Sequence, residues 1–359
     1  MKTQTNDTLT GLRGLLAISV VIYHIYGSAV IEGYIEEWPK GFWNTIVHAL
    51  GPVSVQLFFV ISGYLIIRSI SERRNIGKFF TNRILRIYPV FLTIHLLVFA
   101  IGPFIGYKWM TDISLSSYIV NFFSNLFLLP GLFPLPIAQI VAWSLSYEIA
   151  FYLVSGIIFL AYRSTRIPTF LKYTCLTLIA LSCITIFYLR PDSLFFLVGV
   201  MLYLSEKKLT SWNKPFKVFF LNGILLLLAL FLTYSEEKTF ILLAMLLSYL
   251  FFVPILFQQG LLSMILRTPP MLYLGKISYS LYMWHTMVMF ALKIVMPKIS
   301  VYVPHPTILL LVYGALTILL SIITSHLSYN IIEDRLTQWI KQRLLKRSFS
   351  SKSSTTLQT

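Results

Sequence analysis

Residues 9–30 read LTGLRGLLAISVVIYHIYGSAV, an apolar run in which Arg13 is the one charged side chain and His24 the one imidazole. A helix needs about 20 mostly apolar residues to cross the roughly 30 Å hydrocarbon core of a bilayer. The run is therefore predicted to be a transmembrane helix. Because it contains Arg13 and His24 and lacks a small-residue cleavage site, we do not expect a cleaved signal peptide.

The composition of the whole chain supports the same interpretation. Of its 359 residues, 57% are hydrophobic and 12% are charged, which is about half the charge of an ordinary soluble domain. So little charge excludes a soluble enzyme. The 29 basic and 13 acidic residues leave a surplus of 16 positive charges. In a soluble protein this surplus would suggest nucleic acid, but here it indicates basic loops on one side of a membrane, and no nucleic-acid partner is predicted.

Similar apolar segments recur along the chain, and they predict an all-α polytopic membrane protein with about ten transmembrane helices. Their approximate spans are 9–30, 44–67, 88–107, 140–162, 170–189, 193–205, 216–234, 239–258, 272–295 and 307–332. A further apolar stretch, 113–133, ends among closely spaced prolines that cannot continue a helix, so it is predicted to be re-entrant or interfacial. The transmembrane domain covers residues 1–334, and a basic, partly disordered cytoplasmic tail follows over 335–359.

Positive charge is distributed unevenly between the two sets of connections. For ten spans, 22 of the 29 Lys and Arg residues fall at the termini and in the connections on the same side. Five fall in the opposite connections. Because basic residues accumulate on the cytoplasmic side of membrane proteins, both termini are predicted to be cytoplasmic.

Three titratable residues lie deep within predicted spans. Counted along their helices, His24, Glu148 and His285 are each about 20 Å from the cytoplasmic edge. Arg13 shares a helix face with His24, because eleven residues return a helix to within about 20°. A carboxylate that orients an imidazole is the usual pair for acyl transfer. His24 and Glu148 are therefore candidate catalytic residues. A structural ion pair for Glu148 and a hydroxyl-bonded core position for His24 stay open.

The other four histidines are interpreted as structural. They are His48, His95, His305 and His326. No pair of them has the helical spacing of a metal site, so no metal is predicted.

The connection over residues 68–87 is the most basic of the chain. Most of its charge is explained by the accumulation of basic residues on the cytoplasmic side and by attraction to anionic lipids. Arg83 and Arg86 differ, because a spacing of three puts them on one helix face, just before Tyr88–Pro89, where the chain is predicted to break. Two guanidinium groups aimed together can bind a phosphate bidentately. Arg83 and Arg86, with Arg13 at the same cytoplasmic mouth, are therefore predicted to bind a phosphorylated cofactor.

Five motifs, in order along the chain, resemble those of the membrane acyltransferase-3 family, the integral-membrane O-acyltransferases of bacterial surface glycans and small lipidic or sugar acceptors. The motifs are LRGL (12–15) with YH (23–24), FFVISGY (58–64), RILR (83–86) with YP (88–89), WSLSYE (143–148) with FY (151–152), and ISYSLY (277–282) with WH (284–285). The resemblance extends from about residue 9 to about residue 333. One such motif is weak alone, but five in order, with ten spans, are strong.

The resemblance implies an O-acetyltransferase of the bacterial cytoplasmic (inner) membrane that uses acetyl-CoA or another short acyl-CoA. Arg13, Arg83 and Arg86 would bind the donor from the cytoplasm. The acceptor would be a surface polysaccharide, a lipopolysaccharide O-antigen or a lipid-linked sugar. His24 would act as general base or as transient acyl carrier, and Glu148 would orient it or balance its charge.

Four further residues are candidates for hydrogen bonds to the thioester or acceptor, namely Ser62, Tyr279, Tyr282 and His285. Hydroxyls in spans also hold helices together. The aromatic outer connection 107–139 could cover a sugar or lie on lipid. The competing function is a secondary transporter or flippase of a polar lipid-linked solute, which would also bury a few ionisable groups. The lack of a visible internal repeat counts against a transporter. The three arginines at one mouth are better explained by a phosphorylated donor.

Overall fold

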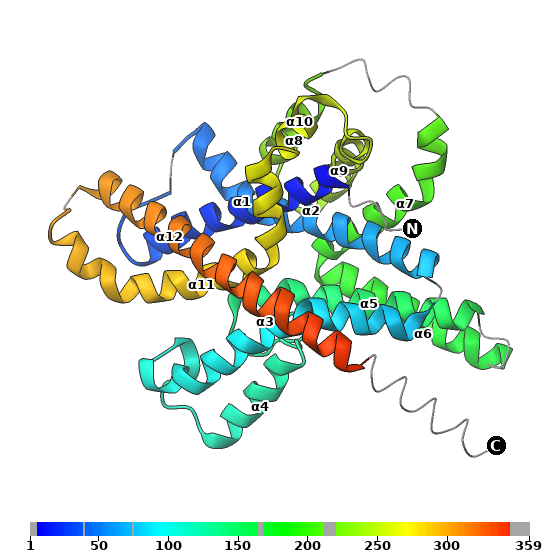
Figure 1. Cartoon of the computed structure of the whole chain (residues 1–359), viewed down its shortest axis with the longest axis horizontal. Coiled ribbons are helices and arrows are strands. Elements are labelled where there is room, and N and C mark those ends of the chain that lie inside the picture. The colour runs from blue at the N-terminus through cyan, green and yellow to red at the C-terminus, as the bar shows by residue number, and fades with distance from the viewer. Residues whose placement is uncertain are drawn as a thin grey trace.

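The computed structural model describes residues 6–38, 40–73, 75–163, 168–211, 220–303 and 305–344 (Figure 1). Within these residues the chain is helical and contains no strand, which confirms the all-α prediction. The α helices are α1 (Asp7–Ile31), α2 (Phe42–Arg73), α3 (Ile76–Ile105), α4 (Leu115–Leu126), α5 (Trp143–Arg163), α6 (Thr169–Leu189), α7 (Phe195–Ser211), α8 (Asn222–Leu232), α9 (Ile241–Leu256), α10 (Gly260–Leu266), α11 (Pro269–Ser300) and α12 (Pro306–Ser328).

In the described part of the chain, six helices are long and apolar enough to cross a membrane. They are α1, α2, α3, α5 with the turn before it, α6, and α12 with its extension to Leu344. The pair α9 and α10, bent by 66°, would make a seventh. The predicted ten spans and the side of the termini are thus not confirmed. The shortfall has physical reasons: α7 has 17 residues and α8 has 11, and polar groups such as His285 and Lys293 lower the hydropathy of α11.

Helix α6 shows most clearly the surface that a bilayer would cover. None of its residues is buried. Even the large apolar side chains of Leu178, Leu181 and Ile184 are 60%, 56% and 62% exposed. An apolar helix exposed on this scale is unfavourable in water and favourable in lipid. The exposed apolar surface therefore agrees with the membrane prediction.

Close packing of α1 against α11 depends on two glycines. A Cβ on Gly14 would lie 2.6 Å from the backbone nitrogen of Gly275, and a Cβ on Gly275 would lie 1.9 Å from the carbonyl oxygen of Thr10. Any side chain at either position would push the helices apart. Small residues at such crossings are typical of membrane helices. They hold the helix of the first sequence motif against the helix of the fifth.

Helix α3 corrects one prediction. It runs unbroken from Ile76 to Ile105 with Pro89 inside it, so the predicted break at Tyr88–Pro89 is wrong. Proline has no N–H to donate to the carbonyl four residues earlier, which is that of Leu85. The hydroxyl of Thr337 donates to this carbonyl oxygen at 3.3 Å. A side chain from the end of the chain therefore supplies the missing hydrogen bond, and the helix continues.

The ends of two other segments bear on the predicted boundaries. Helix α4 has 12 residues and ends at Leu126, before the prolines of the stretch 113–133, so it is too short to span a bilayer. At the other end of the chain, α12 continues through the π-helical turn η6 (Tyr329–Leu336) to Leu344 (Figure 1). The start of the predicted tail, residues 335–344, is thus part of the last helix. Residues 345–359 lie outside the described residues.

Candidate active site

Six of the nine predicted site residues line one narrow cavity between α1, α2, α3, α5 and α11. They are Arg13, Ser62, Arg86, Glu148, Tyr279 and Tyr282. Each comes from a different one of the five sequence motifs, except the two tyrosines, which share the last. Segments that are up to about 270 residues apart in the sequence thus meet at one cavity.

The carboxylate of Glu148 is held by hydroxyl groups. Ser62 Oγ donates to Glu148 Oε1 at 3.3 Å, and the hydroxyl of Tyr152 donates to the same oxygen. One carboxylate oxygen can accept both of these hydrogen bonds. Glu148 also lies within electrostatic range of Arg13 and Arg86. The cavity therefore places one half-buried carboxylate near two guanidinium groups.

A second cavity, of about 370 Å³, opens beside the first. Arg83, Arg86, Glu333 and Lys341 contribute its charged lining. Arg86 lines both cavities, so its guanidinium lies where they adjoin. The wider cavity contains three cationic side chains against one carboxylate. This charge balance suits an anionic group such as a phosphate.

Arg83 is more constrained than Arg86. It is 9% exposed, its Nη2 donates to the carbonyl oxygen of Leu65 at 3.3 Å, and its guanidinium lies 5.5 Å from the ring centres of both Phe79 and Tyr152. These contacts fix the side chain within the protein. Arg83 therefore combines a packing role with its place in the cavity wall, whereas Arg86 is the arginine that faces both cavities.

His24 and His285 form a hydrogen-bonded pair. His285 Nε2 lies 3.1 Å from His24 Nδ1, His285 Nδ1 lies 3.1 Å from the carbonyl oxygen of Leu281, and His24 Nδ1 lies 3.0 Å from that of Val20. A carbonyl oxygen only accepts, so neutral His285 carries its proton on Nδ1 and accepts through Nε2. His24 then carries its proton on Nδ1. Its Nε2 is left with a free lone pair, as a general base requires.

The histidine pair does not line the cavity of Glu148 but lies near Tyr282, which does. The ring centre of Tyr282 is 6.2 Å from that of His285, and its hydroxyl lies 2.9 Å from Ser144 Oγ. Glu148 was expected to orient His24 or to balance its charge. The described hydrogen bonds join His24 to His285, and they join Glu148 to Ser62 and Tyr152. The role of Glu148 toward His24 stays a prediction.

Two residues of the site have no role in the sequence predictions. Tyr152 bonds Glu148 and stacks on Arg83. Glu333 accepts from Ser280 Oγ at 2.9 Å and lies within electrostatic range of Arg13 and Arg86. Tyr152 belongs to the fourth quoted motif (FY, 151–152), which was a signal for it. Glu333 lies just beyond the last predicted span, and only the continuation of α12 brings it to the site.

The four remaining histidines lie away from this site. His48 stacks on Trp38, and His95 is fully buried among phenylalanine rings. His326 bonds the hydroxyl of Tyr273, and His305 caps α12. Among the described residues, no three His, Cys, Asp or Glu side chains are grouped so that they could hold a metal.

The sequence matches known acyltransferases. A family model for an acyltransferase domain matches residues 6–326. The chain is 28% identical to acyltransferase MdmB of Streptomyces mycarofaciens over 236 residues, which are 62% of this chain and 57% of that protein. It is 24% identical to putative acetyltransferase ORF330 of Acidianus two-tailed virus over 304 residues, 79% of this chain and 84% of that protein. The match thus spans little more than half the length of MdmB. No solved structure matches the chain.

Proposed function

The chain belongs to this acyltransferase family, and on that premise we propose that it is an integral membrane O-acyltransferase of the bacterial inner membrane. The donor is cytosolic acyl-CoA, and acetyl-CoA is the form we favour. The acceptor is a hydroxyl group of a surface polysaccharide, a lipopolysaccharide O-antigen or a lipid-linked sugar. The observation that carries the proposal is that the arginine-lined cavity adjoins, at Arg86, the cavity that contains Glu148.

The cationic cavity supports an acyl-CoA donor. Arg83, Arg86 and Lys341 can bind the phosphates of the nucleotide, because guanidinium and ammonium groups form strong charge-assisted hydrogen bonds with phosphate oxygens. The narrow inner cavity beyond Arg86 suits the thin pantetheine arm. Arg13 and Glu148 line that inner part, close to where the thioester would lie.

The free lone pair of His24 supports general-base catalysis. In this mechanism His24 Nε2 takes the proton of the acceptor hydroxyl as its oxygen attacks the thioester carbonyl carbon. The tetrahedral intermediate then collapses, the C–S bond breaks, and the proton passes from the imidazolium to the sulfur of CoA. His285 accepts the Nδ1 proton of His24 in a hydrogen bond and so fixes its tautomer. If His24 instead carries the acyl group transiently, the same lone pair attacks the thioester.

Donor binding is tested by isothermal titration of the purified full-length protein with acetyl-CoA. Arg86→Ala is expected to weaken binding at least about tenfold, since it removes a charge shared by both cavities. Arg335→Ala is the matched control, because Arg335 is an exposed arginine near Glu333 that lines neither cavity. Equal binding by wild type and Arg86→Ala would remove the donor assignment. Transport of a lipid-linked solute without dependence on acyl-CoA would favour the competing transporter or flippase.

A further inference from the structure

An apolar groove of about 540 Å³ lies between α2, α5, α6 and α7. Its lining extends along α5 from Tyr147 to Tyr162, which is about 22 Å of helix. Among the described residues, no Asp, Glu, Lys, Arg or His side chain lines it. A groove that is so long for its volume is narrow. It therefore suits one extended hydrocarbon chain rather than a compact ligand or a pair of chains.

The groove lies in the part of the protein that a membrane would surround. Helices α2, α5 and α6 are each long and apolar enough to cross a bilayer. Helix α6 packs on α5 and on the short helix η3 (Pro191–Leu194) at the edge of the bundle (Figure 1). Three of its side chains, those of Cys183, Ile186 and Phe187, line the groove, and none of them is buried. Hydrocarbon rather than water therefore surrounds the open side of the groove.

The groove shares an aromatic wall with the cavity of Glu148. Phe196 lines the groove and stacks on Phe59, which lines that cavity, with 4.5 Å between the ring centres. Phe151 continues the stack along the groove, and its ring centre lies 4.6 Å from that of Phe196. The groove is therefore a neighbour of the candidate active site and not a remote part of the lipid-facing surface.

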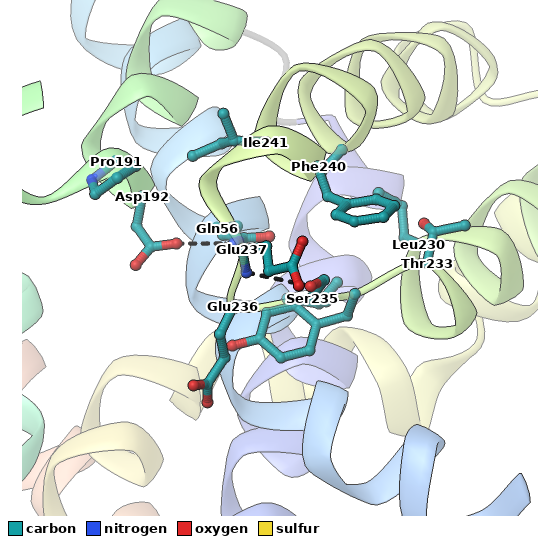
Figure 2. A pocket seen from close by; sticks show the side chains of 13 residues that line it. Gln56, Pro191, Asp192, Leu230, Thr233, Ser235, Glu236, Glu237, Phe240 and Ile241 are labelled. Carbon is teal, nitrogen blue, oxygen red and sulfur yellow. Dashed lines mark hydrogen bonds between the residues drawn. The ribbon is translucent and has the colours of Figure 1, made fainter. Parts of the chain in front are cut away.

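A positive charge lies at the end of the groove that is predicted to face away from the cytoplasm. Ser193 lines the groove and donates from Oγ to the carbonyl oxygen of Arg190 at 2.7 Å, and the Arg190 side chain lies within electrostatic range of Tyr147. Among the described residues, no carboxylate forms an ion pair with Arg190. The nearby Asp192 accepts instead from Gln56 Nε2 at 2.8 Å (Figure 2). The Arg190 guanidinium can therefore bind a phosphate.

We propose that this groove binds the hydrocarbon chain of a lipid-linked sugar acceptor, a proposal that rests on the acyltransferase function. Arg190 binds the phosphate that joins the chain to the sugar. The sugar is thereby kept beside α2 and α5, the two helices that border both the groove and the cavity of Glu148. A free polysaccharide has no chain to fill the groove, so the lipid-linked sugar is selected from the three acceptors named above.

Lipid binding is measured by native mass spectrometry of the full-length protein in detergent, with undecaprenyl phosphate and phosphatidylglycerol as probes. Wild type is expected to retain one undecaprenyl phosphate at least about tenfold more strongly than phosphatidylglycerol, because the groove has room for a single chain. Val154→Phe places a ring in the groove, which Val154 lines, and is expected to weaken this retention by about the same factor. Leu160→Phe is the matched control, since Leu160 is an exposed residue of the same helix outside the groove.

Charge is tested separately with undecaprenol, which has the same chain without the phosphate. Arg190→Gln is expected to weaken binding of undecaprenyl phosphate at least about threefold and to leave binding of undecaprenol unchanged. Arg163→Gln is the matched control, because Arg163 lies at the other end of the groove, 6.0 Å from the ring centre of Phe159. Acetyl-CoA binding should be unchanged in every variant, and this shows that each is folded. If Val154→Phe fails to fold, Arg190→Gln decides.

Three results would overturn the inference. The first is a wild-type protein that binds acetyl-CoA but retains no undecaprenyl phosphate. The second is equal retention of phosphatidylglycerol, since ordinary phospholipid would then fill the groove. The third is undiminished binding of undecaprenyl phosphate in folded Val154→Phe or in Arg190→Gln. A wild-type protein that retains undecaprenyl phosphate but does not bind acetyl-CoA would contradict the proposed function instead, so the two failures are distinguishable.

Discussion

At the scale of single residues, Glu148 provides the negative charge that offsets Arg13 and Arg86. Glu148→Gln keeps an acceptor for Ser62 and Tyr152 but removes that charge, and two half-buried guanidinium groups without a counter-charge are costly. We expect acyl transfer to fall at least about 100-fold, with the protein still inserted and abundant. Transfer of labelled acetyl groups in membranes measures this. Glu72→Gln, which breaks a surface pair with Arg68, is the control, and full activity of Glu148→Gln would remove its role.

His285 is a positioning residue, because it acts through His24. His285→Ala removes the acceptor for the Nδ1 proton of His24, whereas His285→Gln keeps an acceptor oxygen. We expect kcat to fall about tenfold in His285→Ala with the KM for acetyl-CoA unchanged, and to recover in part in His285→Gln. Steady-state kinetics separate the two parameters. Equal losses in both variants would indicate a packing role only.

Six of the nine candidate residues named from the sequence line one cavity, but their hydrogen-bond partners could not be predicted. Glu148 and His24 stood out because ionisable groups are rare in apolar spans. The bond between Ser62 and Glu148 joins residues 86 positions apart, and that between His24 and His285 joins residues 261 positions apart. Equal depth suggested that the histidines could meet. Which helices are neighbours and how each is rotated depend on packing, and no single motif contains that information.

At the scale of helices, the glycine contact between α1 and α11 decides how the site is assembled. Gly275→Ala would place a methyl group against the backbone of α1, because its Cβ would lie 1.9 Å from the carbonyl oxygen of Thr10. We expect the variant to lose about 1–3 kcal/mol of stability and most activity, because overpacking separates the helices. Thermal unfolding in detergent measures the first effect. Gly314→Ala is the control, since its nearest neighbour is 3.6 Å away, and equal melting of both variants would contradict the argument.

The ends of a helix could be predicted where the helix begins and ends together with an apolar run of the sequence. The first span was expected at residues 9–30 and extends over Asp7–Ile31. The third was expected to begin at residue 88 but begins at Ile76, since its first three turns are basic and amphipathic rather than apolar. The continuation through Pro89 depends on Thr337, about 250 residues away. A local rule about proline could not include that contact.

At the scale of the whole molecule, the charge distribution predicts the orientation. With 22 of 29 basic residues on one side, the C-terminus and the arginine-rich cavity should face the cytoplasm. A C-terminal fusion to green fluorescent protein is expected to fluoresce, and a fusion to alkaline phosphatase to be inactive. The reverse pattern would place Arg83 and Arg86 on the side without acyl-CoA, and the donor assignment would fail.

If His24 transfers an acyl group to a surface glycan, the glycans of living cells should record the loss of His24. Surface glycans of a deletion strain are compared by mass spectrometry after complementation with wild type, with His24→Ala, or with His326→Ala as a histidine control outside the site. We predict that wild type and His326→Ala restore an acyl group that the deletion strain lacks. His24→Ala, expressed at the same level, should not restore it. Restoration by His24→Ala, or identical glycans in the parent and deletion strains, would contradict the claim.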